Sequence, residues 1–155
     1  MQAPASVSEN EITSLMRLVH LIEAANQDRP SSDLDLRARM VIQDLGLAGP
    51  ASLVDVRGRL NVTPSTMTSL ADRLQRGGYV RRQPHPTNRR ITMLELTAKG
   101  KRAFSGEMEF YRNLIDQVLR PLGDDARHVV LRALAKLPGA FVPAARGGAV
   151  RADQD

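Results

Sequence analysis

The sequence predicts a mainly α-helical fold that carries one small β-hairpin. Three features of the 155 residues support this fold class. Apolar residues recur at the spacing of one helix face through most of the chain. Glycine, proline and asparagine interrupt that pattern where a helix is expected to begin or end. Only residues 79–96 alternate in the manner of two strands joined by a loop.

Residues 52–61 are expected to form a short helix followed by a tight turn. The Ser52 side chain can accept a hydrogen bond from the first turn of this helix, and Asp55 completes a capping-box-like pair. Asn61 tolerates the left-handed backbone that the turn needs. These residues therefore predict the first half of a helix-turn-helix.

A second helix is expected directly after this turn. Thr63 is its predicted N-terminal cap, and Pro64 suits the first helical position because no N–H is needed there. Gly77 and Gly78 should end the helix. Its buried face is expected to consist of Met67, Leu70, Ala71 and Leu74. The other face carries side chains that can approach a surface closely or reach phosphates and guanine edges: Ser65, Thr66, Thr68, Ser69, Arg73 and Arg76.

A β-hairpin is predicted next, with strands over residues 79–82 and 91–96. The connecting residues 83–90 contain two prolines, which favour a loop outside the ladder. The tip of this loop carries the adjacent residues Arg89 and Arg90. A helix-turn-helix followed by an arginine-tipped hairpin is a winged helix.

These residues resemble the MarR-type winged-helix transcription regulators. The wing signature of that family runs Asp-x-Arg, three residues, Leu-x-Leu-Thr, two residues, Gly, and residues 88–100 agree at every position except Asn88. Residues 62–74 are similar to the family's recognition helix. The resemblance implies that the family's Asp braces the arginine at Arg90, and that Asn88 offers its amide oxygen to the same guanidinium. The match covers about a third of the chain and implies a homodimer, DNA operators and often a small-molecule effector.

Positive charge is concentrated in the predicted winged helix. The net charge of the chain is +5. Residues 57–102 contain eleven basic residues against Asp72 and Glu95, a local charge of +9, so the remainder carries −4. A basic patch on an otherwise acidic chain indicates a polyanionic partner.

Two helices are expected before the helix-turn-helix. The first should run over residues 9–25, residues 27–32 should connect, and the second should run from Asp33 to Leu45. The apolar stripe of the first helix comprises Ile12, Leu15, Met16, Val19 and Ile22, widened by Leu18 and Leu21. The inward residues of the second are expected to be Leu36, Met40 and Val41.

Two further helices are expected after the hairpin. Thr97 should cap a long helix to about Leu119, and Asp124 or Asp125 should cap a last helix that ends before Pro138. A heptad-like seam on the long helix comprises Phe104, Met108, Tyr111, Ile115, Val118 and Leu122. This seam suits a partner helix, and packing against the chain's own first helix is the alternative. The inward residues of the last helix are expected to be Val130, Leu131 and Leu134.

The predicted organisation is a single domain over residues 1–155. Residues 9–32 and 98–137 are expected to supply dimerisation helices, residues 33–97 the winged helix-turn-helix, and residues 138–155 a flexible tail. The N-terminus lacks the basic and apolar regions of a signal peptide, and no apolar run is long enough to span a membrane. A cytoplasmic protein without a membrane segment is expected.

Enzymatic classes of function have no support in the sequence. The absence of cysteine excludes disulfides and thiol-based redox sensing. The histidines His20, His85 and His128 lack HxxxH or HExxH spacing, so neither a metal site nor a cofactor is expected. A glycine-rich phosphate loop and a GxSxG elbow are also absent. The chain is therefore not expected to be an enzyme.

The sequence predicts a DNA-binding transcriptional regulator that acts as a homodimer on an inverted-repeat operator, where it would usually repress. The expected contacts to double-stranded DNA are Ser65, Thr66, Thr68, Ser69, Arg73, Arg76, Asn88, Arg89 and Arg90. A structural ion pair of Arg73 or Arg76 with Asp72 or Asp55 is the alternative for those two arginines. The alternative function is a winged-helix module that binds another protein without reading DNA.

A ligand site is implied only by the family resemblance. That resemblance suggests a small aromatic or anionic effector between the dimerisation helices and the winged helix. His20 is the one candidate ligand that the sequence offers, and a buried or capping histidine is the alternative. Lys99, Lys101 and Arg102 lie in the first turn of the long helix, where positive charge opposes the helix dipole. Both phosphate contacts and solvated side chains account for them.

Overall fold

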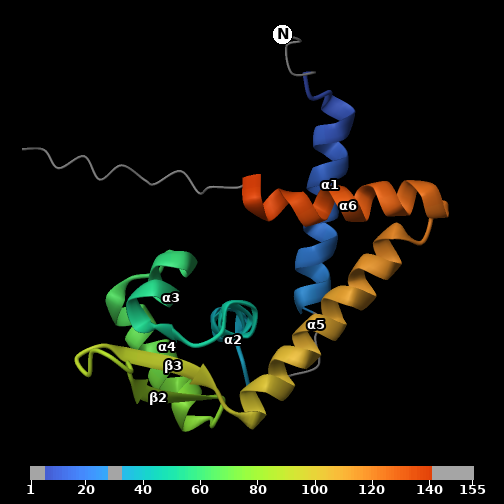
Figure 1. Ribbon diagram of the computed structural model, residues 1–155. Helices are drawn as coiled ribbons and strands as arrows, with labels where there is room; N and C mark the ends of the chain where they lie inside the picture. Colours follow the sequence, from blue (N-terminus) through green and yellow to red (C-terminus); the bar gives the residue numbers. More distant parts are fainter. Residues whose placement is uncertain (1–5, 28–32, 141–155) are drawn as a thin grey trace, which may run out of the picture. The chain divides into compact units, whose positions relative to one another are not determined.

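Six helices and three short strands make up the computed structural model, which describes residues 6–27 and 33–140 (Figure 1). In chain order they are α1 (Glu9–Gln27), α2 (Leu36–Ala48), β1 (Ala51–Ser52), α3 (Leu53–Leu60), α4 (Pro64–Arg76), β2 (Val80–Pro84), β3 (Thr92–Leu96), α5 (Ala98–Leu119) and α6 (Asp124–Ala140). The predicted mainly α-helical winged-helix fold is confirmed. The chain divides into two compact units between Ile115 and Asp116, so α5 begins in the first unit and ends in the second.

The hydrophobic core of the first unit lies among α2, α3, α4 and the sheet. Its members come from each of these elements: Ala38, Val41, Ile42, Leu45, Ala51, Val56, Met67, Leu70, Ala71, Leu74, Val80, Leu94 and Leu96. The predicted buried face of α4 is confirmed in full. Each large aliphatic side chain removed from water contributes about 1.5–3 kcal/mol, so this core holds α4 in place from behind.

Local capping signals place α3 and α4 as the sequence predicts. The Ser52 hydroxyl accepts from the Asp55 N–H at 3.1 Å and donates to the Asp55 carboxylate at 2.6 Å. Asn61 adopts the left-handed conformation, with φ of 50° and ψ of 47°. The Thr63 hydroxyl accepts from the Thr66 N–H at 3.2 Å, directly before Pro64 at the first helical position. These short-range bonds set the angle between the two helices.

The start and the buried face of α2 differ from the prediction. Asp35, rather than Asp33, caps the helix, because its carboxylate accepts from the Ala38 N–H at 2.8 Å. The face that is buried consists of Ala38, Val41, Ile42 and Leu45. The expectation that Leu36 and Met40 point inward is wrong, since they are 53% and 37% exposed. Residues 38, 41, 42 and 45 follow the spacing of one helix face, and Leu36 and Met40 lie beside that face.

The sheet contains one strand more than predicted. β1 pairs with β3, and the strand order is β1-β3-β2, with all pairs antiparallel. The prediction that Gln83 and Pro84 lie in a loop is wrong, since both extend β2 opposite Met93 and Thr92. β2 is an edge strand, where a missing proline N–H can face away from the neighbouring strand at no cost in ladder bonds.

The long helix α5 begins as predicted, and part of its predicted seam is exposed in the single chain. The Thr97 hydroxyl accepts from the Gly100 N–H at 3.1 Å and caps the helix. Phe104 packs against Gly46 of α2, where a Cβ would overlap its ring. Met108 and Ile115 are 45% and 37% exposed. The buried apolar residues of α5 are Leu114 and Leu119, which the seam did not include.

In the second unit, α6 begins at Asp124, so this residue lies inside the helix and does not precede it as a cap. Arg127 forms an ion pair with Asp116. Val130 and Leu131 are half-buried as expected, while Leu134 is exposed. The helix runs to Ala140, past the predicted end before Pro138. Residues 138–140 of the predicted tail at 138–155 therefore belong to α6, and the rest of that tail and most of the predicted connection at 27–32 lie outside the described residues.

Candidate nucleic-acid interface

The exposed face of α4 is polar from its first turn onward. Ser65 is exposed and its hydroxyl lies 3.1 Å from that of Thr63. Thr66 is half-buried, with its hydroxyl 2.8 Å from the Thr63 hydroxyl. The Thr66 hydroxyl therefore belongs to the cap, and Ser65 is the residue of this turn that faces outward most freely.

The second turn of α4 continues this polar face. Thr68 is exposed, and its hydroxyl donates to the Pro64 carbonyl at 3.0 Å. Ser69 is exposed beside it. Small side chains here leave the helix backbone accessible to a close approach by a flat or grooved surface.

The two arginines of α4 differ in their surroundings. Arg73 donates to the Asp35 carboxylate at 2.8 Å, across from the N-terminal cap of α2. Arg76 is exposed, and its Nε lies 3.4 Å from the Asp72 carbonyl oxygen. The expected alternative partners are corrected: Arg73 pairs with neither Asp72 nor Asp55. The ion pair makes Arg73 a brace between α2 and α4.

Asp35 both caps α2 and pairs with Arg73, and both contacts affect the pKa of its carboxyl group. Burial by itself raises the pKa of Asp35, but the hydrogen bond from Ala38 and the ion pair with Arg73 outweigh it, and the net pKa lies below its ordinary value. The carboxylate is therefore charged at neutral pH, when it serves as both helix cap and ion-pair partner.

Three further arginines of the basic region are held by carboxylates. Arg59 makes two bonds of 2.7 Å to Asp44, which raise the pKa of Arg59. Arg81 pairs with Glu95 across the sheet at 2.7 Å. Arg82 pairs with the carboxylate of Asp72 in α4 at 2.7 Å. These side chains stabilise the winged helix and offer less charge outward than the sequence suggests.

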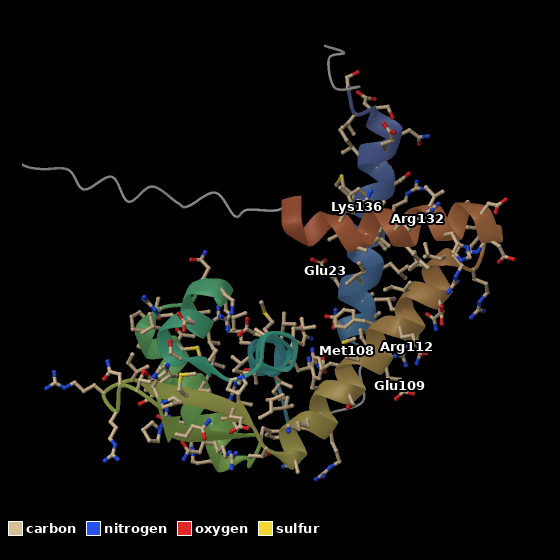
Figure 2. All side chains as sticks on the ribbon, in the orientation of Figure 1. Glu23, Met108, Glu109, Arg112, Arg132 and Lys136 are labelled. Carbon is tan, nitrogen blue, oxygen red and sulfur yellow. The ribbon has the colours of Figure 1, made fainter. Side chains whose placement is uncertain are left out.

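The tip of the wing carries two adjacent arginines without ion-pair partners in the described part of the chain. Asn88 Oδ1 accepts from the backbone N–H of Arg90 at 3.1 Å, so the expectation that Asn88 bonds the guanidinium is wrong. The His85 ring accepts from Thr87, which shapes the loop before the tip. Within the described residues, neither Arg89 nor Arg90 forms an ion pair or side-chain hydrogen bond. Figure 2 shows nitrogen-tipped side chains extending away from the loop between β2 and β3.

Comparison with known proteins agrees with this arrangement. The model of the MarR family matches residues 38–92, which span α2 to the start of β3. The multiple antibiotic resistance protein MarR of Escherichia coli is 30% identical over 96 residues, or 59% of this chain and 67% of that protein. The chain belongs to the MarR family. It is thus a relative of winged-helix transcriptional regulators.

Two other relatives extend the comparison. The transcriptional repressor YetL of Bacillus subtilis is 30% identical over 86 residues, which cover 56% of this chain and about half, 52%, of YetL. Among solved structures, RV1404 of Mycobacterium tuberculosis has a TM-score of 0.70 at 27% identity, and the match covers 90% of this chain and 98% of RV1404. The fold of RV1404 therefore extends over most of the present chain.

The sequence did not single out Arg57, which the structure places beside the polar face of α4. Arg57 lies on α3, is half-exposed and has no ion-pair partner within the described part of the chain. It lines an open groove of about 340 Å³ between α3 and the start of α4, together with Leu53, Val54, Pro64, Met67 and Thr68. Its sequence spacing gave no signal, because Arg59 two residues later has the same surroundings in sequence but is held by Asp44.

Lys99 lies in the first turn of α5 as expected and forms contacts within the chain that the sequence did not predict. Its ammonium donates to the Gly77 carbonyl oxygen at 2.8 Å and lies 4.2 Å from the centre of the Tyr79 ring. Lys101 and Arg102 are exposed, with no such partners among the described residues.

His20, the predicted ligand residue, lies on an exposed part of α1. Over the described ranges, no group of three or more histidine, aspartate or glutamate side chains is placed to hold a metal ion. A membrane-crossing helix, one both long and apolar enough, is likewise missing from those ranges.

Proposed function

We propose that this chain is a transcriptional repressor that binds an inverted-repeat DNA operator as a homodimer. The observation that carries the proposal is the combination of an uncovered polar face on α4 with two unpartnered arginines at the wing tip. A helix of this kind fits a major groove, and arginines at a wing fit the adjacent minor groove. YetL, a related protein, bears the name of a transcriptional repressor, which supports the direction of regulation.

The proposed DNA contacts fall into two groups. On α4, Ser65, Thr68, Ser69 and Arg76 are exposed and supply base or phosphate contacts. At the wing, Asn88 shapes the tip from which Arg89 and Arg90 reach DNA. Thr66 and Arg73 contribute indirectly, because Thr66 belongs to the N-terminal cap of α4 and Arg73 forms an ion pair with Asp35. Arg57 on α3 adds a contact to the phosphate backbone.

The proposed dimer uses the apolar stripe of α1. Four large side chains of this helix are 44–61% exposed in the single chain: Ile12, Leu15, Met16 and Val19. An apolar stripe of this length on a soluble chain marks a surface that another surface covers. A second copy of the chain satisfies both the stripe and the two-fold symmetry of an inverted repeat.

The proposal is tested by selecting bound sequences from random duplex DNA with the purified chain. We expect a two-fold symmetric site with half-site centres about one helical turn, roughly 10 base pairs, apart. Sedimentation at micromolar concentration should give a dimer. A selection that yields no enriched sequence, or a monomer in sedimentation, contradicts the proposal.

The alternative of a protein-binding winged helix is separated by salt dependence. A DNA-binding chain should bind an enriched operator with a log affinity that falls linearly with log salt, by about 0.9 per phosphate contact. A protein-binding module predicts weak DNA affinity without sequence preference. The open wing tip favours the first outcome.

We propose that the effector of this chain is a small aromatic anion. Arg39 on α2 is its better ligand: the side chain is 9% exposed, and its Nε has no hydrogen-bond partner within the described residues. A buried guanidinium without a counter-charge favours an anion. If a panel of aromatic carboxylates yields one that releases DNA, Arg39→Met should abolish the release and His20→Ala should preserve it. Equal loss in both variants contradicts the assignment to Arg39.

A further inference from the structure

The end of α4 and the beginning of α5 meet at one short backbone segment, residues 77–79. Thr97 makes three hydrogen bonds to it: its N–H donates to the Tyr79 carbonyl at 3.0 Å, and its hydroxyl donates to the Gly78 carbonyl at 2.6 Å and to the Tyr79 carbonyl at 3.2 Å. Gly100 lies so close that a Cβ there would overlap the Tyr79 carbonyl oxygen. Gly78 has a φ of 74°, which favours glycine. The recognition helix and the long helix are therefore joined backbone to backbone.

Lys99 adds a side-chain bond to this junction. Its ammonium donates to the carbonyl oxygen of Gly77, the C-terminal cap residue of α4, at 2.8 Å. The same ammonium lies 4.2 Å from the centre of the Tyr79 ring, within the range of a cation–π interaction. One charged group from α5 thus contacts both residues that flank Gly78.

Helix electrostatics explain why a cation stands at this position. A positive charge in the first turn of α5 is unfavourable, because the N-terminus of a helix carries partial positive charge. The C-terminal end of α4 carries unsatisfied carbonyls and partial negative charge, where a cation is stabilising. Lys99 belongs to α5, but its ammonium lies against the C-terminal end of α4. This favourable contact offsets the unfavourable position of the charge at the N-terminus of α5.

We propose that Lys99 is a positioning residue that fixes the angle of the recognition helix α4 relative to α5. This inference rests on the proposed function of a DNA-binding dimer. If the two recognition helices of a dimer are held rigidly to their long helices, the dimer accepts one half-site spacing and rejects others. One base pair of added spacer rotates the second half-site by about 34–36° and moves it by about 3.4 Å. Lys99 therefore sets spacer discrimination and does not contact phosphate.

The experiment compares Lys99→Met with Lys101→Met on operators whose spacer is unchanged or lengthened by one base pair. Both variants lose one positive charge from the same helical turn, and Met keeps the apolar part of the side chain. The parent should bind the unchanged spacer more tightly, and Lys99→Met should reduce that preference by about three- to tenfold, the range for the loss of one ordinary hydrogen bond, because the Lys99 side chain is exposed. Lys101→Met should keep the parental preference.

Two further readouts distinguish positioning from other roles. The preference is a ratio within one preparation, so a loss of folded protein cancels from it. Lys99→Arg, which can also reach the Gly77 carbonyl and the Tyr79 ring, should restore the preference. The slope of log affinity against log salt should be parental in Lys99→Met, because no phosphate contact is lost.

The inference is overturned if Lys99→Met keeps the full spacer preference, if Lys99→Arg fails to restore it, or if the salt slope flattens by about 0.9. A parent chain that binds no operator contradicts the proposed function instead, and that result precedes any comparison of variants.

Discussion

The winged helix and the N-terminal helix α1 differ in how far their large apolar side chains are buried. In the winged helix, Leu94 and Val56 are fully buried, and Leu74 is 1% exposed. In α1, Leu15 and Met16 are 61% and 56% exposed. The winged helix buries its large apolar side chains in its own core, whereas α1 keeps an apolar surface that only contact with another surface can bury. Charge also differs within the winged helix: Arg59, Arg73, Arg81 and Arg82 form ion pairs, whereas the two wing-tip arginines form none within the described residues.

The largest expected effect concerns the self-sufficient core. Leu94→Ala should destabilise the protein by about 2–5 kcal/mol, the cost of a cavity at a fully buried leucine. Urea unfolding at one fixed protein concentration measures it. The matched control is Leu47→Ala in the same unit, where 73% exposure predicts a change within about 0.5 kcal/mol. Equal effects at the two leucines contradict the distinction between core and surface.

The second prediction concerns the uncovered stripe of α1. Leu15→Glu should weaken self-association by about 30-fold or more, because a two-fold interface receives the charge twice. Sedimentation equilibrium over a range of concentrations measures it. Arg17→Glu is the control, since it also adds negative charge to an exposed position of α1. If Leu15→Glu sediments like the parent, the stripe is not the dimer interface.

The third prediction concerns the unpaired arginines. Arg90→Ala should cost about 1–3 kcal/mol of operator affinity, the range for a good specific contact, and Arg89→Ala should cost less. Arg81→Ala is the control, because Glu95 holds that guanidinium at 2.7 Å. Affinities at two salt concentrations give the comparison. Parental affinity in Arg90→Ala would remove the wing from the interface.

A smaller effect is expected at the ion pair of Asp35 with Arg73. The pKa of Asp35 is lowered in the folded state, so its stabilisation is present at neutral pH and is lost as the pH falls through that lowered value. Asp35→Asn should cost under about 1 kcal/mol at neutral pH, because the pair is half-exposed. The difference from the parent should shrink below about pH 4. Unfolding free energies at both pH values test this, and a difference that grows in acid contradicts the assigned sign.

The smallest effect is expected at Asn88. An aspartate there would strengthen the bond to the Arg90 N–H but would add negative charge beside DNA phosphates. The two effects oppose each other, so Asn88→Asp should change operator affinity by under about 1 kcal/mol. The same binding assay measures it, and a tenfold or larger change in either direction would show that one effect dominates.

Much of the fold could be predicted because its signals are local. Ser52, Asn61 and Thr63 each act on backbone within three residues, so their roles follow from sequence order. The buried face of α4 follows from helical spacing. The two-residue strand β1 gave no periodic signal, and its pairing with β3 depends on residues about forty positions away. Local rules do not reach that far.

The roles of individual arginines could not be predicted. Arg57 and Arg59 look alike in sequence, but only Arg59 lies against Asp44. Arg73 pairs with Asp35, 38 residues earlier, rather than with the aspartates nearby. Ion pairs of this kind depend on which helices cross, and charge counting alone overstates the positive surface that remains for DNA.

The sequence by itself determined where the helix-turn-helix begins, turns and ends, because caps, left-handed turns and apolar spacing are properties of neighbouring residues. Only the tertiary structure decided which cations face outward and which hold the fold together. Lys99 illustrates the reason: it stands at an unfavourable helix N-terminus in sequence and bonds the Gly77 carbonyl, 22 residues away, in space. Its partner is brought there by the bonds between the start of α5 and residues 77–79, which no local pattern encodes.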